Sequence, residues 1–217
     1  IRSSARLEGR FDDLPKIELD LRWTTANALM TQGAATAAVH HFARCRKLAL
    51  ELYGPDDRRT LALTGNLASA YDEAGESDKA IPMFEKLLEK MSAVLGPTNP
   101  ETIGALSNLA AACHNAGRLQ ESAAYNERAF QLMKAKLGAD HPQTLKMMSN
   151  LATAYFYLGQ TEKGRKLHEE THFLRSATLG PDHPQTLLSL FYLAEATAEI
   201  GDYAAAATML EEVVVGM

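Results

Sequence analysis

Nine glycines recur at a fixed spacing, and this period restricts the chain to a repeat architecture. Within each of two sets the glycines are 42 residues apart. The sets are Gly33, Gly75, Gly117, Gly159 and Gly201, and Gly54, Gly96, Gly138 and Gly180. No insertion interrupts the register, so each period is expected to be one small unit stacked on the next.

Each unit predicts two helices. In the unit 137–178, Asp140 is expected to be the N-cap, Pro142 supplies a fixed φ in the first turn, and Gln143 completes a D-x-x-Q capping box. Gly159 is expected to end the first helix, and a second periodic run ends at Gly180. The same device is expected at Asp182 with Gln185 and, in a variant form, at Thr98 with Glu101. No alternating strand pattern occurs, so the fold class is all-α.

The period also predicts the domain organisation. Residues 1–10 are expected to be an N-terminal flank and 11–217 a single array. Its units are expected at 11–52, 53–94, 95–136, 137–178 and 179–217, with a degenerate first copy and an incomplete last one. Both ends of the sequence look cut, which suggests a piece of a longer protein.

The spacing inside the unit resembles a known repeat. A period of 42 alone also allows a HEAT or armadillo array. In the second unit, however, Leu67, Ala68 and Tyr71 are followed by Ala80 and Phe84. This resembles the tetratricopeptide core, L-[GA]-x-x-Y followed by A-x-x-x-F. The "LG-x-[DN]-[HP]-P-x-T" linkers and "NLA" motifs are similar to those of kinesin light chains and many bacterial tetratricopeptide proteins. The first and last units depart from this pattern.

The resemblance implies a right-handed superhelical solenoid of antiparallel helix pairs, a tetratricopeptide array whose first helices line a concave wall. Each unit is expected to bury its apolar stripe against the next. The predicted core residues include Leu67, Tyr71, Ala80, Phe84, Leu109, Cys113, Leu151, Tyr155, Leu193 and Ala206.

Three asparagines, Asn66, Asn108 and Asn150, stand at one repeat position. A side-chain amide both donates and accepts, so a row of amides can hold an extended peptide backbone. The resemblance implies that these residues clamp such a ligand. The alternative is that they are helix-surface residues bonded to water or to a neighbouring helix end.

Other first-helix residues are expected on the same wall. The candidate peptide-binding residues besides the asparagines are Ser107, His114, Lys146, Ser149 and Thr153. Asn115, Glu195, Phe156, Tyr157 and Tyr192 are further candidates for this wall, and for the aromatic residues packing between repeats is the alternative. A single lysine, Lys146, does not form a cationic clamp that could bind two carboxylates of a ligand. The expected ligand therefore has mixed or hydrophobic character. The sequence therefore predicts a non-catalytic protein-interaction module.

Residues His168 to His172 spell H-E-x-x-H, the zinc peptidase motif. That hypothesis makes His168 and His172 zinc ligands and Glu169 the general base, with Glu195 or Glu199 as a third ligand. The alternative is that both imidazoles pack between repeats, because His168 stands in register with Phe84. The favoured interpretation is packing, with no metal site, no catalytic residue and no cofactor. His141 and His183 precede prolines and are assigned to helix starts.

The composition excludes other classes. The net charge is −5 without a run of lysine and arginine, so no nucleic-acid partner is expected. The sequence contains no stretch of eighteen apolar residues, so no membrane span is predicted. Cys45 and Cys113 are interpreted as buried thiols of a reducing compartment, which suggests a cytoplasmic protein. Two further hypotheses remain: a partner-recruiting region of a larger signalling protein such as a bacterial kinase, and self-association through an uncovered last helix.

Overall fold

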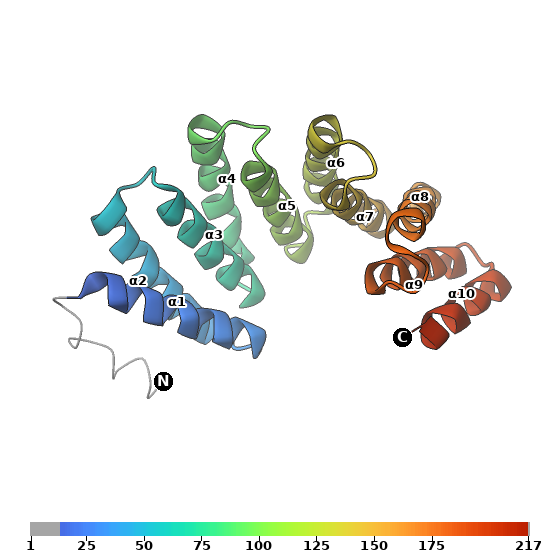
Figure 1. Ribbon diagram of the computed structural model, residues 1–217, viewed down its shortest axis with the longest axis horizontal. Helices are drawn as coiled ribbons and strands as arrows, with labels where there is room; N and C mark the ends of the chain where they lie inside the picture. The colour runs from blue at the N-terminus through green and yellow to red at the C-terminus, as the bar shows by residue number, and fades with distance from the viewer. Residues whose placement is uncertain (1–13, 217) are drawn as a thin grey trace. The chain divides into compact units, whose positions relative to one another are not determined.

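The computed structural model describes residues 14–216, and within this range the chain forms ten α-helices and no strand (Figure 1). The predicted flank 1–10 lies outside the described residues, and the division into five units stays a prediction. The helices are α1 Pro15–Thr31, α2 Ala35–Tyr53, α3 Arg58–Glu73, α4 Ser77–Val94, α5 Pro100–Asn115, α6 Leu119–Leu137, α7 Pro142–Tyr157, α8 Thr161–Leu179, α9 Pro184–Glu199 and α10 Tyr203–Gly216. The all-α fold of consecutive helix pairs is thus confirmed. No helix in this range is long and apolar enough to cross a membrane.

The helices fall into two compact units, each larger than one 42-residue repeat. From here on, the first unit means α1 to α5 and the second unit means α6 to α10. In each unit, every helix packs against the next one along the chain. First helices also meet, since α3 contacts α5 in one unit and α7 contacts α9 in the other.

The first unit is built around a continuous apolar cluster. Its fully buried members come from α1, α2 and α3 and include Ala26, Phe42, Cys45 and Leu67. The Cys45 thiol lies 3.5 Å from the Leu19 carbonyl oxygen, and burial raises the pKa of this thiol to about 12. Both cysteines are buried thiols, as predicted, and the described residues contain no disulfide.

Eight of the ten predicted core residues are buried. The exceptions are Tyr71 and Tyr155, which are only half-buried. Each ring lies near the ammonium group of a lysine on the following helix, Lys79 at 5.4 Å and Lys163 at 5.5 Å from the ring centroid. A tyrosine places its apolar body against the core and its polar end near water, which explains this intermediate exposure.

The first helix pair carries charged residues where other copies have neutral ones. Glu18 and Arg22 on α1 are both buried, and Glu18 accepts hydrogen bonds from Arg22 and from Arg44 on α2. The Arg44 guanidinium, followed by that of Arg22, lowers the pKa of Glu18. The degenerate sequence of the first copy therefore corresponds to a buried ion network that joins α1 to α2.

The helix caps lie one residue later than predicted. The N-caps of α3, α5, α7 and α9 are Asp57, Asn99, His141 and His183, again 42 residues apart. Each side chain accepts a hydrogen bond from the backbone N–H two residues on, such as Gln185 onto His183 Nδ1 at 3.1 Å.

The expected caps Asp140, Asp182 and Thr98 are therefore wrong, and Gln143, Gln185 and Glu101 do not complete capping boxes. The reason is the proline. Proline is favoured at the first helical position and forces an extended backbone on the residue before it, so that residue becomes the cap. Structural roles for His141 and His183 are nevertheless confirmed.

The periodic glycines end helices, as predicted. All nine have positive φ, between 71° and 92°. At Gly159, the Gln160 N–H donates to the Tyr155 carbonyl and closes α7 with a Schellman-type turn. Gly180 ends α8 at φ 92° and ψ 158°, a conformation that is essentially restricted to glycine.

We expect the cap position to be measurable by substitution. His183→Ala should lower the free energy of unfolding by about 0.5–1 kcal/mol, because the Gln185 N–H loses its acceptor. Asp182→Ala should stay within about 0.5 kcal/mol of wild type. Urea unfolding at mildly alkaline pH compares the two variants. If Asp182→Ala lowered the free energy of unfolding more than His183→Ala does, Asp182 would be the N-cap instead.

Gly164 on α8 predicts a close approach of two helices. It occupies the position of Ala80 and Ala206, and a Cβ built there would lie 2.7 Å from the Ala152 carbonyl oxygen of α7. Gly164→Ala should therefore destabilise the protein by about 1–3 kcal/mol, although alanine favours helix. Gly104→Ala on α5 meets no atom within 4 Å and should stabilise by about 0.5–1 kcal/mol. Thermal unfolding tests the pair, and equal shifts in midpoint would contradict the packing argument.

Candidate functional site

The predicted peptide-binding residues of the first unit lie on two neighbouring first helices. Asn66 is on α3, and Ser107, Asn108 and His114 are on α5. Asn108 is exposed, Asn66 and His114 are half-buried, and Ser107 is buried. Asn115, another expected wall residue, donates from Nδ2 to Asp72 Oδ2 at 2.8 Å and so ties α5 to the end of α3.

In the second unit, four predicted residues share one face of α7. Lys146, Ser149, Asn150 and Thr153 follow the i, i+3, i+4, i+7 spacing that places side chains in one row. Lys146 is exposed, Asn150 and Thr153 are half-buried, and Ser149 is only 8% exposed. The Thr153 hydroxyl donates to the Ser149 carbonyl at 3.1 Å, which fixes its rotamer. The Ser149 side chain therefore offers little surface to a ligand.

This row leads to a small pocket of about 80 Å³ between α7 and α9, which we call the α7–α9 pocket. Its lining residues are Thr153, Phe156 and Tyr157 of α7, His168 of α8, and Tyr192 and Glu195 of α9. Sequence reasoning expected five of these six residues on the wall. The structure brings those five together within one unit.

His168 is the lining residue that the groove prediction missed. Its side chain is 2% exposed, and its ring stacks on that of Tyr192 with centroids 5.5 Å apart and planes 21° apart. Burial, together with the nearby Arg175 charge, lowers the pKa of His168 to about 4. The imidazole is therefore neutral at physiological pH. Its Nδ1 atom has no hydrogen-bond partner among the described residues. The sequence could have indicated this residue, because His168 is a polar residue at the repeat position that Phe84 occupies in an earlier copy.

The other residues of the H-E-x-x-H stretch face different surroundings. His172 Nδ1 lies 3.3 Å from the Thr186 carbonyl oxygen of α9, and Arg175 donates to the Gln185 carbonyl at 3.0 Å. Glu169 instead pairs with Arg165 on the exposed side of α8. The two histidines thus pack against the next repeat, as the packing hypothesis predicted. Within residues 14–216 no three histidine, cysteine or acidic side chains are grouped as metal ligands would be.

The family follows from a sequence comparison. The tetratricopeptide repeat model matches residues 21–93, 101–172 and 143–214, which is most of the chain. The chain therefore belongs to the tetratricopeptide repeat family. No curated protein sequence matches it significantly.

Solved structures with the same fold agree. A Podosopora anserina kinesin-light-chain-type protein with nearly identical TPR-like repeats is 25% identical, with a TM-score of 0.80, over 91% of this chain and 93% of its own. BtubC (BKLC) from P. vanneervenii is 17% identical, with a TM-score of 0.77, over 99% and 87%. The Rap conjugation gene regulator of plasmid pLS20, solved in complex with the Phr* peptide, is 13% identical, with a TM-score of 0.69, over 87% and 50%. The predicted resemblance to kinesin-light-chain-like repeats is confirmed.

The buried His168 makes stability depend on pH. Because folding lowers the pKa of His168 from 6.5 to about 4, the unfolded chain binds a proton between these values that the folded chain excludes. Stability should therefore fall as pH drops from 6.5 to 4, by about 1–3 kcal/mol. His168→Phe, the residue of the equivalent position 84, should reduce this slope in urea unfolding. Some slope should remain, because burial also lowers the pKa of His41. Parallel curves for wild type and His168→Phe would contradict the assignment.

Proposed function

We propose that this protein binds an extended peptide segment of a partner protein along the face of its first helices. The observation that carries the proposal is the α7–α9 pocket, which continues the row of polar side chains on α7. An extended peptide is held through its backbone by amide side chains, while pockets receive individual side chains. Asn150 and Thr153 suit the first role, and the pocket suits the second.

The walls of the pocket indicate what it accepts. Phe156, Tyr157 and Tyr192 offer aromatic surface, and the Glu195 carboxylate is the one charged group among the lining residues. The neutral His168 ring closes the pocket without adding positive charge. We infer a small apolar side chain in the pocket, followed by a ligand donor that reaches Glu195. This fits a ligand of mixed character better than a doubly acidic chain end.

The comparisons support a role in protein interaction. The matched family consists of helical repeats rather than an enzyme family, and the Rap regulator with this fold was solved with a peptide. We accordingly propose a non-catalytic protein. The zinc peptidase hypothesis lacks support, because Glu169 faces Arg165 and no third ligand stands near the two histidines among residues 14–216.

The setting of this interaction is also a proposal. We infer a cytoplasmic protein from its two buried thiols, which form no disulfide among the described residues. The chain would serve either by itself or as the partner-recruiting region of a larger signalling protein such as a kinase. The sequence of the full gene decides between these two arrangements.

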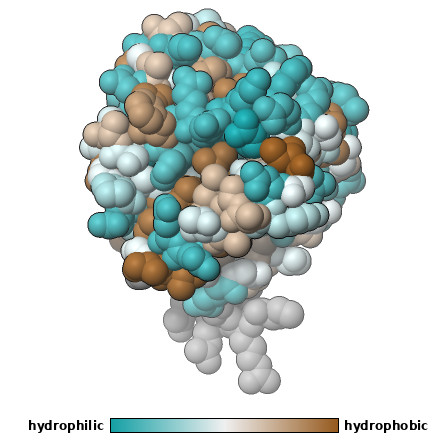
Figure 2. Space-filling model, turned by 90° about the vertical axis from the view of Figure 1, so that its right-hand side faces the viewer, coloured by the Kyte–Doolittle hydropathy of each residue, from teal (hydrophilic) through white to brown (hydrophobic). Residues whose placement is uncertain are grey.

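Self-association is a second candidate, favoured by one surface. In α10, Tyr203, Val214 and Val215 are 72%, 75% and 88% exposed. Figure 2 faces the side on which α8 to α10 are drawn in Figure 1, and apolar side chains are visible there among polar ones. A dilution series in multi-angle light scattering, with Val214→Ser as comparison, tests whether α10 pairs two copies.

The peptide site can be tested with peptides selected on the wild-type protein from a random display library. Asn150→Ala should weaken binding about fivefold, because a backbone hydrogen bond is worth about 1 kcal/mol. Tyr192→Ala should weaken it at least as much by opening the pocket. Gln131→Ala removes an exposed amide from the second helix α6 and serves as the matched control. Fluorescence anisotropy measures each affinity. If Asn150→Ala and Tyr192→Ala bind like wild type, the site lies elsewhere.

A further inference from the structure

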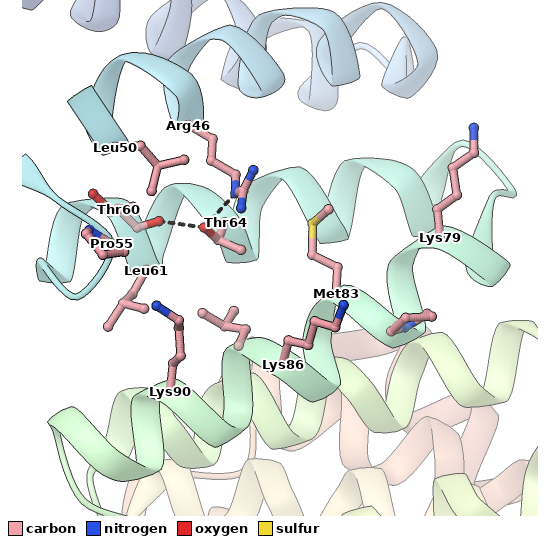
Figure 3. A pocket seen from close by; sticks show the side chains of 12 residues that line it. Arg46, Leu50, Pro55, Thr60, Leu61, Thr64, Lys79, Met83, Lys86 and Lys90 are labelled. Atoms are coloured by element: carbon pink, nitrogen blue, oxygen red, sulfur yellow. Dashed lines mark hydrogen bonds between the residues drawn. The ribbon is translucent and has the colours of Figure 1, made fainter. Parts of the chain in front are cut away.

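A second, larger cleft lies in the first unit, between two second helices that carry none of the predicted groove residues. It has a volume of about 410 Å³ and is walled by α2 and α4, with α3 as its floor (Figure 3). That volume is within the range of sites that bind ligands. Leu50, Leu61, Met83 and Leu87 give it an apolar interior. We call it the α2–α4 cleft.

The rim of the α2–α4 cleft is cationic. Arg46 from α2 and Lys79, Lys86 and Lys90 from α4 line it, and none of its lining residues is acidic. This is notable in a chain whose net charge is −5. In Figure 3, Lys86 and Lys90 extend from α4 toward the side where Arg46 lies on α2.

Three lining residues depart from the apolar register of the repeat. Position 46 is arginine, where the other copies have Leu88, Phe130, His172 and Val214. Position 64 is threonine, where later copies have Leu106, Met148 and Leu190, all buried. Position 90 is lysine, where other copies have Leu48, Leu132 and Leu174.

The polar residues at these positions forgo apolar burial, and the interactions they make inside the protein are weak. Leucine or methionine at position 64 would bury apolar surface, worth about 1.5–3 kcal/mol for a fully buried side chain. The residues present instead leave the cleft open. A binding site explains why three polar side chains stand around one opening at positions that are mostly apolar in the other copies.

Two of the four cations have no ion-pair partner within residues 14–216. Arg46 Nε donates to the Thr64 hydroxyl at 3.2 Å, and Arg46 makes no ion pair among the described residues. Lys86 likewise makes none there. Lys90 pairs with Asp56 at 2.9 Å, but both side chains are largely exposed, and such pairs are weak. Lys79 pairs with Glu76 on the surface.

We propose that the α2–α4 cleft binds a short acidic amphipathic helix of a partner protein. The apolar face of that helix packs on Leu61, Met83 and Leu87, and its flanking glutamates or aspartates meet Arg46 and Lys86. Helix-in-groove recognition has this form, with an apolar stripe in the groove and charges at the rim.

The spacing of the cations favours a helix over a small anion. Lys79, Lys86 and Lys90 are spread over eleven residues of α4, or roughly 16 Å at the helical rise. A small carboxylate meets one or two of these ammonium groups, whereas a partner helix of about three turns meets the whole row. Arginine adds a planar fork that pairs with a carboxylate through two hydrogen bonds.

The test uses two fluorescein-labelled synthetic helices of roughly 14 residues, long enough to cover the lysine row. One has leucines at i, i+3, i+4 and i+7 with glutamates beside them, and the other has lysine at each glutamate position. Fluorescence anisotropy should show binding of the glutamate peptide to the wild-type protein and none of the lysine peptide.

Variants of the protein distinguish the effect of the cations on binding from the effect of the open volume of the cleft. Lys86→Glu, at an exposed position, should weaken binding of the glutamate peptide by about tenfold. Thr64→Met keeps every cation but introduces the residue of position 148, so it should fill the cleft, abolish binding and raise the unfolding temperature. Lys47→Glu makes the same charge change on the exposed face of α2 outside the cleft and should leave affinity within about twofold.

Four results overturn the proposal. The first is equal binding of both peptides, and the second is undiminished binding to Thr64→Met. The third is decanoate binding that depends on Arg46 and Lys86 while neither peptide binds, which makes a small anion the occupant. The fourth is concentration-dependent association of the wild-type protein that Thr64→Met removes, which makes a second copy the occupant. Because no variant here touches the α7–α9 pocket, failure leaves the peptide-binding proposal standing.

Discussion

Packing between consecutive helices is the constraint on which the rest of this structure depends. Every helix of a unit finds its main partner in the next helix along the chain, so the fold is assembled from contacts that are local in sequence. The position shared by Ala38, Ala80, Gly164 and Ala206 shows how strict this packing is. At Gly164 the facing carbonyl of α7 leaves no room for a methyl group. Small side chains there let two helices approach, and the approach buries the larger residues beside them.

The polar features of this protein lie where a copy departs from the residues that the other copies share. Where a copy keeps its leucines and phenylalanines, the space between helices is filled. Where it replaces them, the structure holds either a buried polar arrangement, such as Arg22 bonded to Glu18, or an open cleft. His168 and the α7–α9 pocket follow this rule, and so do Arg46, Thr64 and Lys90 around the α2–α4 cleft. In a repeat protein, the copies can therefore be compared with one another. A residue that differs from the apolar residue at the same position in the other copies indicates a role other than packing.

The H-E-x-x-H stretch illustrates why a motif needs its surroundings. Its spacing puts two imidazoles on one face of a helix, as a zinc site requires. In this repeat the same face packs on the following helix, so the rings meet Tyr192 and the Thr186 carbonyl instead. The caps show a related limit. Asp140 and His141 are both plausible acceptors in sequence, and the proline that follows selects the second because it restricts the backbone of its neighbour.

The sequence by itself determined the helix pairs, their order and the residues that turn inward. A strict period places equivalent side chains in equivalent surroundings, and apolar spacing is a local property of the chain. Eight of the ten core residues and the family could therefore be predicted. Only the tertiary structure decided which polar side chains share a site. Thr153 and His168, or Arg46 and Lys86, come from different helices, and whether they meet depends on packing distances between those helices. Sequence spacing carries no measure of such distances, so the pockets became visible only with the fold.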